Sequence, residues 1–562
     1  MTRGSAYALL GVMSAGVFLA GLELMVTAVA LPTIILDFSA NAQNPFAELR
    51  RASWIVNGYL LAYIVAMPLA GRMADVWGAR RLFLGALGLF VAGSFVAGAA
   101  QSIDQLIAGR VVQGIGGGIL VPVGTAVASH LFEGHARPRA LGVIGALTFL
   151  GMAAGPFVGA AILGGFDAEG GLTALAVGAE DPIRAFFAPS WRWVFYLNVP
   201  IGIAAILIAW AASAGWETPR RGGRIDVVGA VVWTIALGGG LVAVTLLGSP
   251  EGTGLDPLLV SAALGAAAVV ATIFTIVRGF RVPDPFLDPR LFRSLTFASA
   301  AAVSLLTGYA FATAIVGGAV FVDRVLYGGP EQQQAALGSL AAATAIGALV
   351  SGFAVRYLSL RLVTVAGLAM SAGALLWMAR WTPAVGLAEV ALVLATFGAG
   401  FGLTVTPRST AAVETAGRAS FGMASAIVTV ARMIGMAIGV AVLTAYGSTT
   451  INNLYDELFA VPDGWKQVIP EELRDRSLRD AFVVDALEGW AAGKASEILV
   501  GLFVVAGVVT IVAVPPGLAL GGAARTRMLA DDRDEDAGLA AAPSAIAREP
   551  DGRDERRPTI AL

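Results

Sequence analysis

The stretch LGVIGALTFLGMAAGPFVGAAIL, residues 141–163, recurs in altered form as FGMASAIVTVARMIGMAIGVAVL, residues 421–443. Three glycines keep their places at a constant separation of 280 residues: Gly142 and Gly422, Gly155 and Gly435, Gly159 and Gly439. A second pair of segments, GRMADVWGARR from residue 71 and GFAVRYLSLR from residue 352, repeats at a separation of 281. A nearly constant offset in two distant segments predicts a chain built from two homologous halves.

The composition is that of a membrane protein. Hydrophobic residues make up 57% of the chain, charged residues only 14%, and the mean hydropathy is +0.77. The net charge of -2 says nothing about nucleic acid, and no basic run indicates such a partner. The chain has no cysteine, which excludes thiol chemistry, and no recognisable metal or nucleotide motif. We therefore expect no cofactor, and an ion gradient as the energy source.

Fourteen segments are long and apolar enough to cross a bilayer core of about 30 Å, which needs about 20 helical residues. They are residues 7–36, 53–73, 82–100, 106–127, 141–163, 193–213, 227–247, 258–277, 297–321, 336–355, 362–378, 387–406, 421–446 and 498–514. Six spans repeat after an insertion of two. The predicted fold is an all-α polytopic membrane protein with two pseudo-symmetric six-helix bundles and two inserted helices, a design that suits a rocking transporter with its cavity between the bundles.

The same pattern sets the domain organisation. Residues 1–213 are predicted to form the N-terminal bundle, 214–296 the connecting loops with the inserted helices, and 297–517 the C-terminal bundle. Residues 518–562 are predicted to be a disordered cytoplasmic tail. Arginines gather in alternate loops, so we expect both termini in the cytoplasm and the protein in the plasma membrane.

An extracytoplasmic extension is predicted at about 447–497. It contains RSLRDAFVVDALEGW, residues 476–490, in which Leu478, Phe482, Val483, Leu487 and Trp490 recur at helical spacing. This pattern indicates an amphipathic helix outside the membrane or an outward extension of the flanking spans. Its apolar face either packs on the protein itself or docks a partner or lipid.

Several motifs resemble those of the major facilitator superfamily. GRMADVWGARR resembles its loop signature, LIAGRVVQG at residues 106–114 a fourth-span element, and GMAAGPFVG at residues 151–159 the signature of its proton-coupled exporters. LELMVTAVALP, residues 22–32, and WRWVFYLNVPIG, residues 191–202, resemble the drug:proton antiporter branch with fourteen helices. The two long outer segments, 164–190 and 447–497, are similar to members that export lipids such as triacylglycerides.

Glu23 lies in the middle of the first span. An ionised carboxylate at the bilayer centre costs roughly 2.5–3.5 kcal/mol on insertion scales, so it must face the protein interior, pair with a cation or be protonated. A carboxyl that alternates between these environments can carry a proton. Arg432, about midway along 421–446, is the expected partner because the two residues lie at similar depth. The resemblance implies that Arg110 also takes part in proton coupling. The alternative is that Arg110 has only a structural role.

The loop after the second span is predicted to hold a conformational lock. Asp75 can cap the N-terminus of another helix, and the resemblance implies that this cap ties one bundle to the other. Arg80 and Arg81 can pair with acids of the inner loops or with lipid phosphates, and Gly71 and Gly78 complete the motif.

The fifth span carries Gly151, Gly155 and Gly159 on one face. Such a stripe allows a neighbouring helix to approach closely, and Pro156 removes a backbone hydrogen bond and permits a bend. We expect this helix at the bundle interface, where it limits leak.

Polar and aromatic residues of the spans are candidates for lining the substrate cavity. They are Asn57, Tyr59, Tyr63, Asn198 and Tyr309. The function predicted from these features is export of a lipophilic compound, a drug-like molecule or a lipid, in exchange for protons, and not an enzymatic activity. Proton-coupled uptake of a small polar solute is the alternative within transport, and a membrane receptor or enzyme is the alternative outside it.

Overall fold

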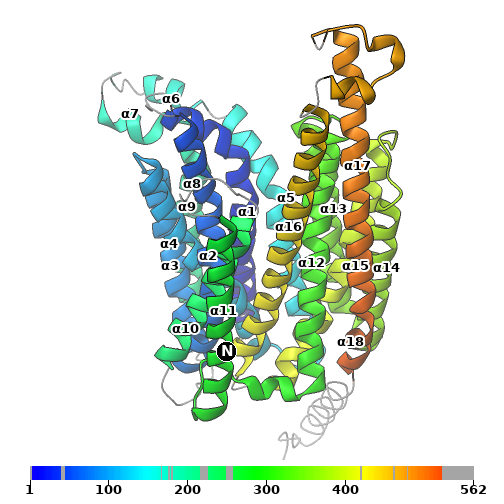
Figure 1. Cartoon of the computed structure of the whole chain (residues 1–562). Helices are drawn as coiled ribbons and strands as arrows, with labels where there is room; N and C mark the ends of the chain where they lie inside the picture. The colour runs from blue at the N-terminus through cyan, green and yellow to red at the C-terminus, as the bar shows by residue number, and fades with distance from the viewer. Residues whose placement is uncertain are drawn as a thin grey trace, which may run out of the picture.

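The computed structural model describes residues 3–39, 45–165, 167–174, 178, 181–214, 226–247, 257–417, 420–459, 463–477 and 479–521. Within these residues the chain is helical and has no strand. Two groups of long, nearly parallel helices stand side by side (Figure 1). The predicted all-α fold with two bundles is confirmed.

The N-terminal bundle is formed by the first six spans. Its long helices are α1 (Arg3–Ser39), α2 (Pro45–Trp77), α3 (Ala79–Gly98), α4 (Ile103–Leu131) and α5 (Ala136–Gly165). The sixth span is divided at Leu197 into α8 (Arg192–Tyr196) and α9 (Asn198–Ala212). Between α5 and α8, the predicted loop carries two short helices, α6 (Ala168–Ala174) and α7 (Pro182–Phe187).

The C-terminal bundle repeats this plan after the two inserted helices, α10 (Val227–Leu247) and α11 (Pro257–Arg281). After the 3-10 turn η1 (Pro289–Arg293), its spans are α12 (Leu295–Arg324), α13 (Pro330–Ala354), α14 (Leu360–Met378), α15 (Leu387–Ala416), α16 (Phe421–Phe459) and α17 (Ala481–Val512). Thirteen helices of the described chain are long and apolar enough to cross a membrane, and the shorter apolar part of α10, Val227–Ala243, is the fourteenth candidate.

Glycine contacts show that the halves are copies in space as well as in sequence. In α5, a Cβ added at Gly155 would lie 2.9 Å from the carbonyl oxygen of Leu22 on α1. In α16, a Cβ at the matching Gly435 would overlap the carbonyl oxygen of Leu305 on α12. Each half therefore packs its fifth helix onto its first through bare glycine backbone.

The two ends of the molecule differ. We call the end at which α1 begins and α18 (Val514–Leu518) ends the terminal face, and the opposite end the far face. The bundles meet near the terminal face and diverge toward the far face (Figure 1). Residues 519–521 form a last helical turn, so the tail expected from residue 518 is ordered there. The rest of it, 522–562, lies outside the described residues.

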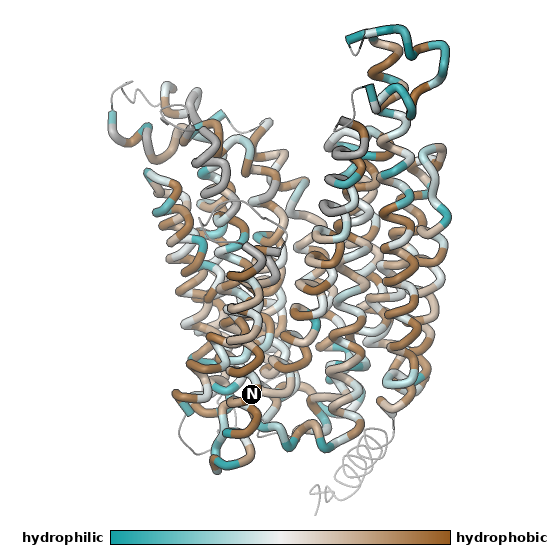
Figure 2. The backbone as a smooth tube through the Cα atoms, in the orientation of Figure 1, coloured by the Kyte–Doolittle hydropathy of each residue, from teal (hydrophilic) through white to brown (hydrophobic). Residues whose placement is uncertain are grey.

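An extension rises from the far face on α16 and α17. At about 1.5 Å per residue, the 39 residues of α16 span about 58 Å, well beyond a bilayer core of about 30 Å. Leu458, Trp465, Ile469 and Val483 form a small core at the tip, where hydrophilic residues cover the outside (Figure 2). In this extension Val483, Leu487 and Trp490 pack on the protein itself, and its extracytoplasmic location stays a prediction. Phe482 is exposed, and Leu478 lies outside the described residues.

Candidate functional site

A buried carboxylate forms the centre of the N-terminal bundle. The Glu23 side chain on α1 is completely buried. Arg110 on α4 donates from Nη1 to Glu23 Oε2 at 2.6 Å, which makes an ion pair. Asn198, at the start of α9, donates from Nδ2 to the other carboxylate oxygen, and Thr27 donates to Oε2 over 3.4 Å.

The guanidinium of Arg110 is held from several sides. Nη1 also donates to Gln113 Oε1 at 2.6 Å, and Nε donates to the Ile55 carbonyl at 3.2 Å. Cζ lies 4.1 Å from the ring centroid of Tyr59, a cation–π contact. Gln113 in turn donates to Ser94 Oγ at 2.7 Å. This network draws on α1, α2, α3, α4 and α9, so protonation of Glu23 would change contacts throughout the bundle.

Arg432 is not the partner of Glu23 in this conformation. Its side chain on α16 is buried, and its Cζ lies 5.5 Å from the ring centroid of Phe149 on α5. The predicted contact was therefore wrong, while Arg110, predicted to serve the same proton step, makes the ion pair. Equal depth was the basis of the prediction, and depth does not fix the direction in which a side chain points.

The candidate cavity residues fall in four different places. Tyr59 and Tyr63 point into the core of the N-terminal bundle, and both are completely buried. Asn198 belongs to the carboxylate site. Tyr309 is buried in the aromatic cluster of the C-terminal bundle. Asn57 lines an open cavity between α2, α10 and α16. None of the cavities described here brings two of these residues together, and their part in a substrate cavity stays a prediction.

The bundles are tied together at the terminal face by Asp75, near the end of α2. Its carboxylate oxygens accept hydrogen bonds from the backbone N–H groups of Gly422 at 2.9 Å and Met423 at 3.0 Å. These are free donors of the first turn of α16, so Asp75 caps that helix and favourably meets its dipole. A Cβ at Gly71 would lie 2.6 Å from the Gly422 carbonyl oxygen. We call this contact the α2–α16 seal; it supplies the predicted cap.

The other residues of the loop motif lie within one bundle. Arg80 donates from Nε to Ser213 Oγ at 2.7 Å, which joins α3 to the end of α9. Among the described residues no acid pairs with Arg80, and its pairing with a lipid phosphate stays a prediction. Arg81 is exposed. Gly78 has a φ of 93° at the N-cap of α3, a conformation that other residues rarely adopt.

A second contact joins the bundles between α5 and α13, and we call it the α5–α13 seal. A Cβ at Gly352 would lie 2.9 Å from the Pro138 carbonyl oxygen and 3.3 Å from the Cα of Gly142. Nearby, Arg137 at the start of α5 pairs with Glu414 near the end of α15 at 3.8 Å. The two seals are related by the internal repeat, because Gly71 and Gly352 are matching positions.

The glycine stripe of α5 faces α1. A Cβ at Gly151 would overlap the Phe18 carbonyl oxygen, and one at Gly159 would lie 3.3 Å from Val26. The close helix approach is as predicted. The partner is a helix of the same bundle, however, and a different face of α5 meets α13. Pro156 is half-buried.

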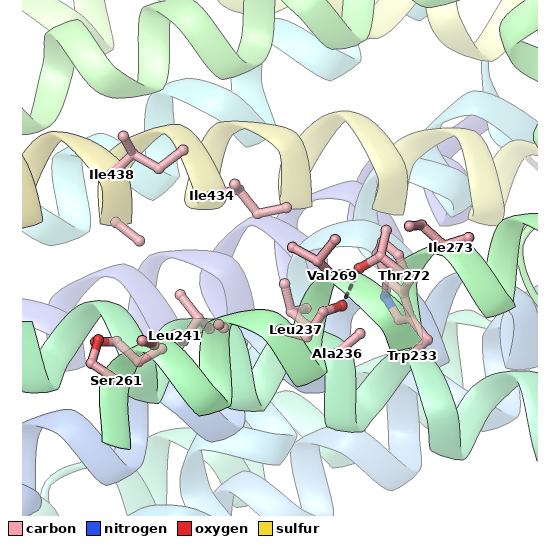
Figure 3. A pocket seen from close by; sticks show the side chains of 16 residues that line it. Trp233, Ala236, Leu237, Leu241, Ser261, Val269, Thr272, Ile273, Ile434 and Ile438 are labelled. Carbon is pink, nitrogen blue, oxygen red and sulfur yellow. Dashed lines mark hydrogen bonds between the residues drawn. The ribbon is translucent and has the colours of Figure 1, made fainter. Parts of the chain in front are cut away.

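An apolar groove follows α16 along the inserted helices. A cavity of about 600 Å³ lies between α10, α11 and α16 and is lined by residues such as Leu237, Val269 and Ile438 (Figure 3). The hydroxyls of Ser261 and Thr272 are bonded to the carbonyls of Ala243 and Ala268, so they offer little to a ligand.

Two further cavities share walls with the first. One of about 450 Å³ shares Trp233 and Ile434 and lies between α2, α12 and α16; another of about 340 Å³ shares Leu241 and Ala437 and contains Asn57. Together we call them the lateral groove. Nε1 of Trp233 is buried there without a hydrogen-bond partner. The groove is suited to hydrocarbon chains that carry few polar groups.

The inserted helices are clamped at the terminal face. Asp226, just before α10, accepts hydrogen bonds from Arg278 Nε and Nη2 at 3.0 and 2.8 Å, and from the Gly229 N–H at 2.9 Å. Burial raises the pKa of Asp226, but these hydrogen bonds outweigh burial and the pKa is lowered.

Two repeated six-helix bundles, sealed to each other at one end, define a membrane transporter of the alternating-access class. The profile of the Major Facilitator Superfamily matches residues 13–440. The chain belongs to the major facilitator superfamily, and it is a multi-pass transporter rather than an enzyme.

Its curated relatives are named for a lipid. A triacylglyceride transporter of Mycolicibacterium hassiacum is 33% identical over 445 residues, which cover 76% of this chain and 78% of that protein. A triacylglyceride transporter of Mycolicibacterium smegmatis is 33% identical over 433 residues, with coverage of 75% and 72%.

Solved structures share the fold. The human organic anion transporter MFSD10 matches with a TM-score of 0.55 at 13% identity, covering 91% of this chain and all of that one. A bacterial homologue of the human lysosomal transporter Spinster, in an inward-facing conformation, matches with a TM-score of 0.54 at 18% identity and coverage of 93% and 100%.

Proposed function

We propose that this protein exports a lipid, such as a triacylglyceride, across the plasma membrane in exchange for protons. The proposed exchange for protons is supported by one observation. Glu23 is completely buried, ion-paired with Arg110 and hydrogen-bonded by Asn198. A buried carboxylate is stable either charged with its partner in place or neutral after taking up a proton. Each change of state alters the network between five helices and thereby favours one arrangement of the bundles.

The lipid part is supported by the lateral groove and by the names of the relatives. The groove presents mainly apolar side chains, the amide of Asn57 and no carboxylate among its lining residues. A triacylglyceride consists mainly of hydrocarbon chains, with ester groups as its polar part. A small polar solute would require more polar groups, so uptake of such a solute is disfavoured.

The orientation is part of the proposal. Arginines gather in the loops of the terminal face, which by the positive-inside rule is cytoplasmic. With both seals closed on that face, the conformation described here is the outward-facing one. Asp75 then stabilises the outward-facing state, and the proton reaches Glu23 from outside.

The test is transport by purified protein in liposomes that contain a fluorescent triacylglyceride, with and without an imposed pH gradient. Wild type should move the lipid faster when the gradient is present. Glu23→Gln should lose that stimulation while it inserts and folds normally, and Glu331→Gln, which alters an exposed acid at the start of α13, should retain it. Undiminished proton coupling in Glu23→Gln would disprove the proposal.

A further inference from the structure

The C-terminal bundle buries two arginines that have no acid to neutralise them. Arg408 on α15 is 2% exposed and Arg432 on α16 is 8% exposed. Among the residues that the structure describes, neither forms an ion pair with a carboxylate. The N-terminal bundle, by contrast, neutralises Arg110 with Glu23.

The two arginines border one aromatic cluster. Arg408 lies with its Cζ 5.2 Å from the Phe401 ring centroid, and Arg432 with its Cζ 5.5 Å from that of Phe149. The rings of Phe149 and Phe401 are themselves 5.5 Å apart, edge to face. The arginines are close enough to repel each other electrostatically.

Hydrogen-bond donors around the arginines are in excess. Arg408 Nη1 donates to Thr307 Oγ1 on α12 at 2.5 Å, and Gly308, the next residue, packs against the backbone of Arg432. Nε of Arg432, Oη of Tyr63 and Oγ of Ser304 are buried and have no hydrogen-bond partner. Tyr63 interacts electrostatically with Arg432. The cluster thus has positive charge and unused donors, but no carboxylate from the described part of the chain pairs with it.

A buried charge without a counter-ion costs several kcal/mol, and two like charges cost more. A carboxylate or phosphate removes this cost, because a guanidinium presents a planar set of donors that matches both groups. We propose that Arg408 and Arg432 form a binding site for the carboxylate or phosphate of an acidic lipid, which this transporter carries in addition to, or in place of, a neutral glyceride. This inference rests on the proposed export of lipids and narrows the substrate class.

The position of the arginines favours a lipid over a free anion. Leu305 and Leu306, directly before Thr307 on α12, line the lateral groove, as does Ala431, directly before Arg432 on α16. Acyl chains in the groove would therefore lie at the same depth along these two helices as the cationic site. Because Gly308 of α12 packs against the backbone of Arg432, the two helices must separate there to let an acidic head group reach the arginines.

The experiment measures binding of palmitate, methyl palmitate and inorganic phosphate to the purified full-length protein in detergent at pH 8. Palmitate and its methyl ester share a chain and differ in charge. We expect wild type to bind palmitate at least tenfold more tightly than methyl palmitate. The double variant Arg408→Gln/Arg432→Gln should lose this preference, and Arg380→Gln, which removes an exposed arginine after α14, should keep it.

Equal affinity of wild type for palmitate and its methyl ester would overturn the proposal, and this comparison needs no variant to fold. A preference that survives in the folded double variant would overturn it as well. Phosphate that binds alone as tightly as palmitate, with the same dependence on the arginines, would overturn the lipid assignment in favour of a free anion. Glu23→Gln should lose proton coupling but keep the preference for palmitate, so failure of the two proposals can be told apart.

Discussion

The two halves of this transporter share a helix plan but treat buried charge in opposite ways. In the N-terminal half, Glu23 and Arg110 neutralise each other. In the C-terminal half, the glycine contacts align Leu22 with Leu305, so the position of Glu23 is taken by Leu306, which faces the lateral groove. Arg408 and Arg432 remain without an acid there. Under the two proposals, the duplicated fold has one half that holds a proton and another that holds an anion.

Among the variants that test this difference between the halves, we expect a change at Arg110 to have the largest effect. Arg110→Gln leaves Glu23 buried without a cation, so the carboxyl remains protonated in both conformations. We expect transport driven by a pH gradient to fall at least tenfold and its pH dependence to disappear, measured in liposomes between pH 5 and 8. Arg110→Lys, which keeps the charge, should restore part of both. Unchanged pH dependence in Arg110→Gln would show that the ion pair is purely structural.

The seals provide the second comparison, because only the α2–α16 seal has a cap that joins the bundles. Asp75→Asn retains one acceptor oxygen and loses the charge that meets the helix dipole, which is worth about 0.3–2 kcal/mol. We expect the terminal face to open more often. The chain has no cysteine, so a single Ala74→Cys beside Gly422 can report on this opening by maleimide labelling. Faster labelling in the Asp75→Asn background is expected, and an unchanged rate would contradict the role of the cap.

Glycine-to-alanine variants test which of the two seals is packed more tightly. Gly71→Ala places a Cβ 2.6 Å from both the Cβ of Ala426 and the Gly422 carbonyl oxygen, and Gly352→Ala places one 2.9 Å from the Pro138 carbonyl oxygen. Overpacking of this kind costs about 1–3 kcal/mol. We expect the melting temperature in detergent to fall most for Gly71→Ala and less for Gly352→Ala. Gly85→Ala on α3, with no atom within 4 Å of the added Cβ, is the control and should leave it unchanged.

The smallest effect is expected at the clamp of the inserted helices. The pKa of Asp226 is lowered in the folded protein, so its contribution to stability is present above the unfolded-state pKa of about 4 and is lost as pH falls through the folded value. Asp226→Asn should lower the melting temperature slightly at pH 7 and by less near pH 3. Equal melting temperatures of the variant and wild type at pH 7 would argue that the clamp adds nothing to stability.

Sequence patterns predicted the architecture because the features that build it are periodic. Apolar length located the spans, and the glycine offsets located the repeat, whose matching positions Gly71 and Gly352 lie in the two seals. Asp75 was predicted as a cap because a carboxylate can cap a helix N-terminus and the resemblance implied that the cap joins the bundles; the structure places it near the end of α2 rather than in a loop.

Side-chain direction within the spans was not predictable in the same way. The partner of Glu23 was assigned from depth, and depth does not specify azimuth. Arg408 was overlooked because apolarity ends near Thr406, whereas the helix continues to Ala416. The carboxylate network of Gln113 and Ser94 and the indole of Trp233 depend on contacts between helices, for which a single sequence offers no signal.

The cap on α16 has a mechanical consequence. This helix is held by Asp75 at one end and carries the miniature core of the extension at the other, about 58 Å away. It can therefore act as a lever: a tilt of about 10° at the fastened end would sweep the tip through about 10 Å, given that length. Release of the two backbone hydrogen bonds to Asp75 at the terminal face would then move the tip of the extension, at the far face, by a comparable distance.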